Sequence, residues 1–128
     1  MSFLDLNLDD VVELAAVEPD REYKLRVIDV REGTDKNGNG YFMPRFEVVD
    51  EVGAKDFTYF LGLPNDSMDP KRVNNAKRKI KNFLDAFSLP YDSNPVNDWP
   101  GAEGWAILGL EETDQWGAQN FIKKFVKG

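Results

Sequence analysis

The sequence predicts a mainly β domain, a five-stranded Greek-key barrel with one amphipathic helix between strands 3 and 4. Two observations predict it. Short segments of alternating polarity are separated by glycine-rich or polar turns, and one longer segment between them has helical spacing. The chain has 128 residues, of which 41% are hydrophobic and 12% aromatic, enough for one core and too few for two domains.

The first strand is predicted at residues 23–31, where hydrophobic and charged residues alternate. The alternation changes phase at Val27 and Ile28, which predicts a β-bulge. Residues 32–40 are rich in Gly, Asn and Asp, which tolerate positive φ. This segment is therefore predicted to form a hairpin loop.

The second and third strands are predicted at residues 41–50 and 57–63, with a turn between them. In the second strand Pro44 indicates a sheet edge or a bulge, because proline has no N–H for the ladder. The inward face of this strand is predicted to carry Phe42, Phe46 and Val48.

The helix is predicted at residues 69–87, with Asp69 as N-cap and Pro70 at the first helical position. Its apolar residues recur at intervals of three and four, which places them on one face. They are Val73, Ala76, Ile80, Phe83, Leu84 and Phe87.

An irregular connection is predicted at residues 88–100, followed by strands at 104–110 and 120–126 with a turn at 111–117. Five short strands with a helix between the third and fourth is the order of an OB-fold, and a different five-stranded barrel with the same linear order is the alternative. The OB-fold holds oligonucleotides or oligosaccharides on strands 2 and 3 and on the 1-2 and 4-5 loops.

The charge is unevenly distributed. The net charge is −7, and residues 1–22 alone carry −6. Residues 90–119 hold six acids and no base, whereas residues 23–89 hold twelve bases against ten acids. We therefore divide the chain into an acidic N-terminal segment, 1–19, predicted to be a short helix or an arm, and an OB-fold-like barrel domain, 20–128.

Catalysis is not predicted. The chain has no His and no Cys, so the commonest general base, nucleophile and metal ligands are missing. Asp35–Gly40 matches the opening of a calcium loop, but its twelfth position is Phe46 where a bidentate Glu is needed. We expect no enzyme, no cofactor and no metal site; a carboxylate-based, metal-dependent enzyme is the alternative that this composition leaves open.

Side chains on the outward faces of the first strands predict a binding surface for single-stranded nucleic acid. Such binders combine a cationic groove for phosphates with aromatic faces on which bases stack. Strand alternation turns basic and aromatic residues outward, and loops contribute others. The candidate contacts are Lys24, Arg26, Lys36, Tyr41, Arg45, Phe60, Trp116 and Lys123. The alternative for the three aromatic residues is that they cover the ends of the barrel, because exposed apolar atoms are normal on any protein surface.

The predicted helix offers a rival surface. Six bases fall within residues 71–81, which indicates either a solvated face or a second phosphate-binding patch. The acidic N-terminal segment is of opposite charge. We therefore consider the hypothesis that this segment competes with DNA for the basic surface.

Several stretches resemble small bacteriophage proteins of the replication module that are thought to be single-stranded-DNA-binding OB-fold proteins. The resemblance rests on a glycine-rich turn before strand 2 and a Gly-x-x-Asn near the end, the latter also suited to satisfying backbone groups. The similar stretches are 23–31, 33–41, 46–50, 100–101 and 117–125. Unlike the usual phage binder, this chain ends in a basic segment, 123–128, without an acidic tail.

This resemblance implies sequence-independent binding of single-stranded DNA during phage replication or recombination, in the host cytoplasm, with replication or recombination proteins as partners. RNA is the alternative ligand, and the oligomeric state stays open. No signal peptide or membrane-spanning run is present in the sequence, so no membrane partner is expected. The other function class is a protein-protein adaptor or virion component docking through Trp99, Trp105 and the acidic region 90–119.

Overall fold

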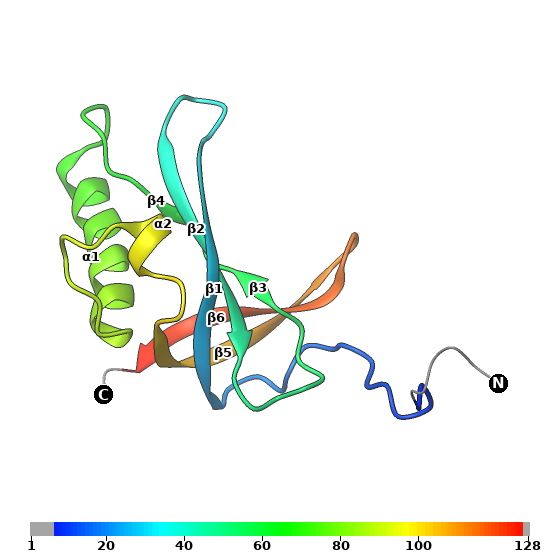
Figure 1. Cartoon of the computed structure of the whole chain (residues 1–128). Coiled ribbons are helices and arrows are strands. Elements are labelled where there is room, and N and C mark those ends of the chain that lie inside the picture. The colour runs from blue at the N-terminus through cyan, green and yellow to red at the C-terminus, as the bar shows by residue number, and fades with distance from the viewer. Residues whose placement is uncertain (1–6, 127–128) are drawn as a thin grey trace.

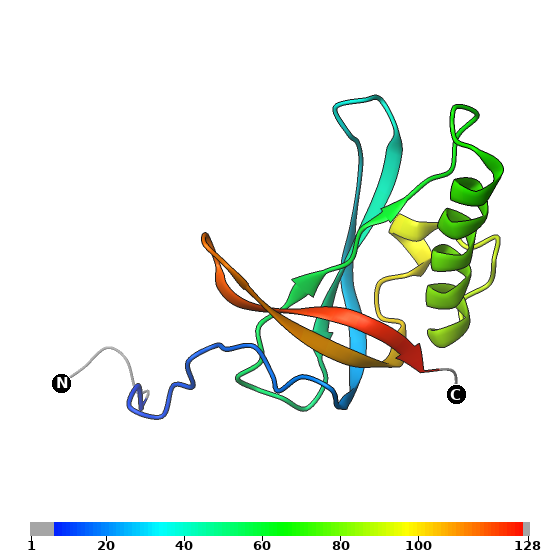
Figure 2. The ribbon, with the colours of Figure 1, turned by 180° about the vertical axis from the view of Figure 1, so that it is seen from behind.

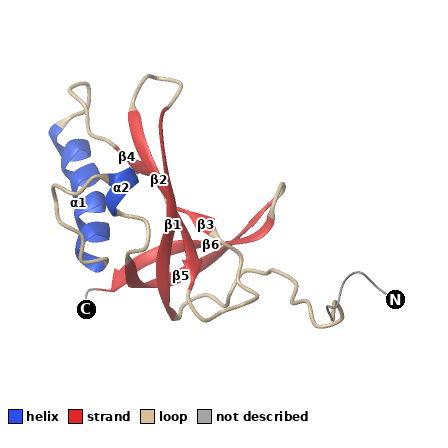
Figure 3. Ribbon diagram, in the orientation of Figure 1, coloured by secondary structure: helices blue, strands red, loops and turns tan. Residues whose placement is uncertain are grey.

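A computed structural model of the chain describes residues 7–126. They form a mainly β structure, an open six-stranded antiparallel sheet with two helices beside it (Figure 1; Figure 3). The elements in chain order are β1 (Glu22–Thr34), β2 (Gly40–Val48), β3 (Phe57–Thr58), β4 (Leu61–Gly62), α1 (Pro70–Ala86), α2 (Pro95–Asp98), β5 (Glu103–Thr113) and β6 (Gly117–Val126). The predicted β-rich class is confirmed at this level.

The sheet is built around β1. Its strand order is β3-β2-β1-β5-β6, and β4 also pairs with β2. The β1–β2 and β5–β6 hairpins project in different directions from the body (Figures 1 and 2). The register between β1 and β2 shifts between Val27 and Asp29, which confirms the predicted bulge.

The predicted third strand, residues 57–63, is divided into two short strands. β3 pairs with β2 at Phe46, and β4 pairs with β2 at Phe42. Between them the Tyr59 N–H donates to the Pro44 carbonyl at 3.0 Å. Proline has no N–H to return a bond, and this missing donor accounts for the interrupted ladder.

Both long hairpins have shorter loops than the sequence predicts. In the β1–β2 loop the Asp35 carboxylate accepts the N–H groups of Asn37 and Asn39, each at 2.9 Å. Those bonds lower the pKa of Asp35. In the β5–β6 loop Gly117 adopts φ +70° and pairs with Thr113. The positive φ lets the chain turn tightly, so the strands stay paired up to Thr113.

Helix α1 begins where the sequence predicts. The Asp69 carboxylate accepts the Arg72 N–H at 2.9 Å, and Pro70 follows at the first helical position. The segment predicted to be irregular contains the short helix α2, capped by Asn94. Among the described residues, no helix has the length and apolar character needed to cross a membrane.

An aromatic cluster fills the space between the sheet and α1. Phe46 lies at its centre, with ring centroids 5.7 Å from Phe57, 5.9 Å from Phe83 and 5.4 Å from Phe87. Burying each such side chain contributes about 1.5–3 kcal/mol. This cluster fixes α1 against the sheet.

Trp99 also belongs to this core. It is 3% exposed, and its indole N–H donates to the Ser93 hydroxyl at 2.9 Å. The prediction that Trp99 forms part of a docking surface was therefore wrong, because the core covers the ring. Trp105, the other tryptophan in that prediction, is 46% exposed.

Residues 7–17 form an irregular arm with a turn at Asp9 and Asp10 and without a helix. Ala15 makes a parallel bridge with Ala54, and Val17 is hydrogen-bonded to Asn120. From these contacts the arm leads away on the side of the molecule opposite α1 (Figures 1 and 2). Residues 1–6 of the predicted acidic segment lie outside the described residues.

Candidate functional site

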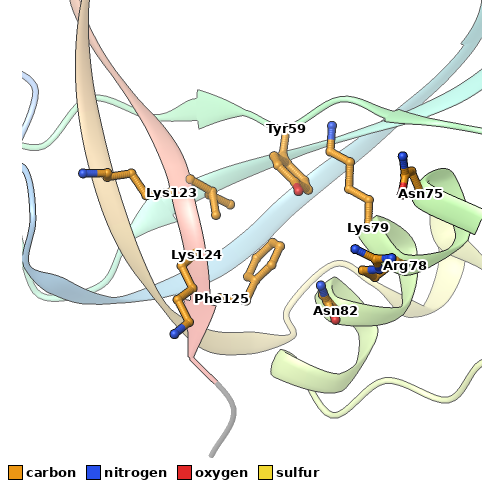
Figure 4. A pocket seen from close by; sticks show the side chains of 9 residues that line it. Tyr59, Asn75, Arg78, Lys79, Asn82, Lys123, Lys124 and Phe125 are labelled. Carbon is orange, nitrogen blue, oxygen red and sulfur yellow. The ribbon is translucent and has the colours of Figure 1, made fainter. Parts of the chain in front are cut away.

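A groove of about 530 Å³ lies between α1 and β6 (Figure 4). Four of its nine lining residues are cations and none is acidic, although the chain has a net charge of −7. We call it the α1–β6 groove. It is lined by Tyr59, Asn75, Arg78, Lys79, Asn82, Ile122, Lys123, Lys124 and Phe125.

The helix supplies one wall through its 3.6-residue period. Asn75, Arg78, Lys79 and Asn82 follow one another at intervals of three, one and three residues, so they share a face of α1. The adjacent face carries Phe83, which is fully buried. The core contacts of α1 thereby turn the polar stripe toward the groove.

The end of β6 supplies the opposite wall. β6 is the last strand in the sheet order, and none of the described strands pairs with its outer edge. Ile122, Lys123, Lys124 and Phe125 line the groove from this strand. Phe125 packs edge-on against Tyr59, with ring centroids 5.3 Å apart, so the floor of the groove is aromatic.

Three groove cations have no carboxylate partner within residues 7–126. Arg78, Lys79 and Lys124 form no ion pair there, whereas Lys123 contacts Asp20 at 2.6 Å. Unpaired cations attract phosphate more strongly than neutralised ones. The positive potential of the groove therefore rests mainly on these three side chains.

Lys79 is partly buried over the aromatic floor. Its ammonium nitrogen lies 4.6 Å from the ring centroid of Tyr59 and 6.0 Å from that of Phe60. Burial lowers the pKa of Lys79 and raises the pKa of Tyr59 to about 12. A phosphate entering the groove would give Lys79 the counter-charge that it lacks.

Two of the predicted contacts lie on the outer face of β1 as expected, but acidic neighbours pair with them. Arg26 contacts Glu103 at 2.6 Å and Glu47 at 2.7 Å, and Lys24 contacts Glu103 at 3.4 Å. The hydrogen bond with Glu103 raises the pKa of Arg26, and the same bond lowers the pKa of Glu103. These cations are largely neutralised.

A second part of the predicted surface lies along β2. Arg45 is exposed and contacts Asp29 at 2.8 Å. Tyr41 stacks on Phe60 with ring centroids 5.0 Å apart, and Phe60 is 44% exposed. Because Lys79 lies near both Phe60 and the floor of the groove, this aromatic pair borders the α1–β6 groove.

The remaining predicted contacts are dispersed. Lys36 lies in the β1–β2 loop, and Trp116, which is 66% exposed, lies in the β5–β6 loop. These loops end two hairpins that point in different directions (Figure 1). Of the eight candidates, Lys123 is the one that lines the groove.

Sequence reasoning missed six lining residues of the groove, which are Tyr59, Asn75, Asn82, Ile122, Lys124 and Phe125. The pattern 75, 78, 79, 82 on the predicted helix was the available signal, since it marks one polar face. No local pattern indicates that this face lies opposite the last strand. That pairing depends on the tertiary fold.

Comparison with known proteins identifies no family. Neither a family model nor a curated protein matches this sequence. Function must therefore be argued from the residues of the site.

Proposed function

We propose that this protein binds single-stranded DNA through the α1–β6 groove, without catalysis and largely without regard to base sequence. The observation that carries the proposal is a groove with four cations, an aromatic floor and no acidic lining residue on a chain of net charge −7. Single-strand binders use this combination, because the cations contact the phosphates and the rings stack with bases.

The strand arrangement supports an OB-fold-like barrel as the framework. β1 pairs with both β2 and β5, and the end strands β3 and β6 approach each other. We take β3 and β4 together as the third strand of a partly open Greek-key barrel. In that description the groove lies where the end strands fail to pair, beside α1.

A path for the strand follows from the aromatic contacts. Tyr59 and Phe60 are adjacent, Lys79 lies near both rings, and Tyr41 stacks on Phe60. A nucleic acid strand in the groove would thus extend to the Tyr41–Phe60 pair. Each stacked base contributes about 1–3 kcal/mol, which is enough to make this pair a measurable part of the affinity.

The cellular role we propose is protection or organisation of single strands during phage replication or recombination. The resemblance of the sequence to phage replication proteins supports it. Asn75 and Asn82 supply donors and acceptors that suit any base, in keeping with weak sequence preference. The titration described next also shows whether the protein prefers RNA to DNA, because it compares oligo(U) with oligo(dT).

The test is a titration of fluorescently labelled oligo(dT), oligo(U) and duplex DNA of equal length, at low salt and at two higher concentrations. A triple variant, Arg78→Gln, Lys79→Gln and Lys124→Gln, removes the groove charges. Its control removes three charges elsewhere on α1, through Lys71→Gln, Arg72→Gln and Lys77→Gln.

The wild type is expected to prefer single strands over duplex DNA, and its affinity for them should fall as the salt concentration rises. The groove variant should reduce the slope of log K against log salt by about 2, since each phosphate contact on a single strand contributes about 0.7. The control should keep most of the slope. Absence of binding at low salt, or equal loss in both variants, would overturn the proposal and favour the adaptor alternative.

A further inference from the structure

The arm presents apolar side chains that are more than half exposed in the described chain. Between residues 7 and 14 it exposes Leu8 by 61%, Val11 by 65%, Val12 by 55% and Leu14 by 60%. Apolar side chains clustered in this way mark an interaction site more often than a solvated surface. The arm therefore has the character of a segment that binds another surface.

The arm is directed away from the groove of its own chain. Asn120 holds both backbone groups of Val17, at 2.8 and 3.0 Å, and Ala15 is bridged to Ala54. Beyond these points the arm continues on the side opposite α1 (Figures 1 and 2). These contacts keep the arm from its own groove, but they leave it able to reach the groove of a second molecule.

Charge complementarity indicates which surface the arm fits. Asp9, Asp10 and Glu13 give residues 7–14 three negative charges and no positive one. The α1–β6 groove carries Arg78, Lys79 and Lys124 without ion pairs in the described chain, beside the apolar Ile122 and Phe125. An acidic and apolar segment matches both properties of this groove.

The backbone geometry also favours an extended occupant. The outer edge of β6 has no partner among the described strands, and such an edge accepts an extended peptide as an added strand. In an extended arm Leu8, Asp10, Val12 and Leu14 fall on one face and Asp9, Val11 and Glu13 on the other, so each face carries both apolar and acidic side chains. Eight extended residues span about 26 Å, similar to the roughly 26 Å length of a 17-residue helix such as α1.

We propose that residues 7–14 of one molecule occupy the α1–β6 groove of a second copy of this chain. The arm adds to the edge of β6, its apolar side chains cover Ile122 and Phe125, and its carboxylates pair with the cations of the groove. Self-association of this kind weakens with salt. It also closes the groove to other anionic ligands until they displace the arm.

Sedimentation velocity of the full-length protein without nucleic acid tests this at low and high salt. The arm variant carries Asp9→Asn, Asp10→Asn and Glu13→Gln. The groove variant carries Arg78→Gln, Lys79→Gln and Lys124→Gln. A control neutralises three exposed acids of the β5–β6 hairpin, through Glu111→Gln, Glu112→Gln and Asp114→Asn.

At low salt the wild type and the control are expected to sediment as oligomers and to shift to the monomer value at high salt. The arm variant and the groove variant should each sediment as monomers. Their equimolar mixture should form a dimer, because the intact arm of the groove variant meets the intact groove of the arm variant. This complementation distinguishes the proposed contact from general charge effects.

A wild type that is monomeric at every salt concentration would overturn the inference, as would association that survives in the groove variant or a mixture that stays monomeric. None of these measurements contains nucleic acid. Failure here therefore leaves the proposed DNA binding standing, and failure of DNA binding leaves this inference standing.

Discussion

Asn120 and Val17 are joined by two hydrogen bonds. The Val17 N–H donates to Asn120 Oδ1 at 2.8 Å, and Asn120 Nδ2 donates to the Val17 carbonyl at 3.0 Å. The same amide also donates to the Gly109 carbonyl at 2.9 Å. Asn120 is 5% exposed and is the one buried polar side chain among the described residues. Asn120 thus attaches Val17, the last residue of the arm, to the β5–β6 hairpin.

Replacing Asn120 with Ala should destabilise the protein by about 2–3 kcal/mol, because three backbone groups, one buried and two part-buried, lose their partners. Urea unfolding would show the loss as a lower midpoint with an unchanged slope. Gln119→Ala is the matched control on the same strand, and we expect it to change stability by less than about 0.5 kcal/mol. Equal midpoints for Asn120→Ala and the wild type would contradict this role.

Gly104 permits a close approach between β5 and the end of α1. A Cβ at this position would lie 2.6 Å from the Ala86 carbonyl oxygen and 2.8 Å from Cδ1 of Phe87. Because backbone is the nearest obstacle, Gly104→Ala should cost about 1–3 kcal/mol. In Gly40→Ala the added methyl would meet only a terminal methyl of Leu63, at 3.2 Å, so a smaller cost is expected. Thermal unfolding of both variants checks the order, and a Gly104→Ala melting point no lower than that of Gly40→Ala would contradict it.

Features that depend on neighbouring residues were predictable from the sequence. The bulge near Val27 follows from a change of phase within one strand, and the start of α1 follows from Asp69 and Pro70. The division of the third strand was not predicted. It depends on Pro44 lying opposite Tyr59, a cross-strand relationship that the alternation of one segment does not contain.

Predicting the site requires knowledge of long-range contacts, more than predicting the strands and the helix does. Strand alternation turned Arg26 outward, but its partner Glu103 is 77 positions away in the sequence. That ion pair changes Arg26 from an available cation to a neutralised one. Similarly, Arg78 of α1 and Lys124 of β6 line the same groove. No local sequence pattern indicates that these two elements lie side by side.

The Tyr59 phenol should resist ionisation in the folded protein. Burial raises its pKa to about 12, whereas an unfolded tyrosine ionises near its usual value of about 10. The unfolded chain therefore releases this proton first, so the stability contribution is complete below about pH 10 and is lost as pH rises to about 12.

Ultraviolet titration of the phenolates in the folded protein would show a step near pH 12 that is absent in Tyr59→Phe. Denaturant unfolding across the same pH window should show a smaller decline in stability for that variant than for the wild type. A folded wild type and Tyr59→Phe with the same phenolate titration above about pH 10 would contradict the burial of this phenol.

Phe60 and Trp105 allow a matched test of base stacking, since they are 44% and 46% exposed and differ in position. Phe60 stacks on Tyr41 and lies 6.0 Å from the Lys79 ammonium, whereas Trp105 is on β5 and does not line the groove. Phe60→Ala should weaken oligo(dT) binding on the order of tenfold, because one stacked base contributes about 1–3 kcal/mol. Trp105→Ala should leave affinity within about twofold of the wild type, as measured by the same fluorescence titration at low salt. If Trp105→Ala is the variant that loses affinity, the strand follows β5 and not the path from the groove to Tyr41.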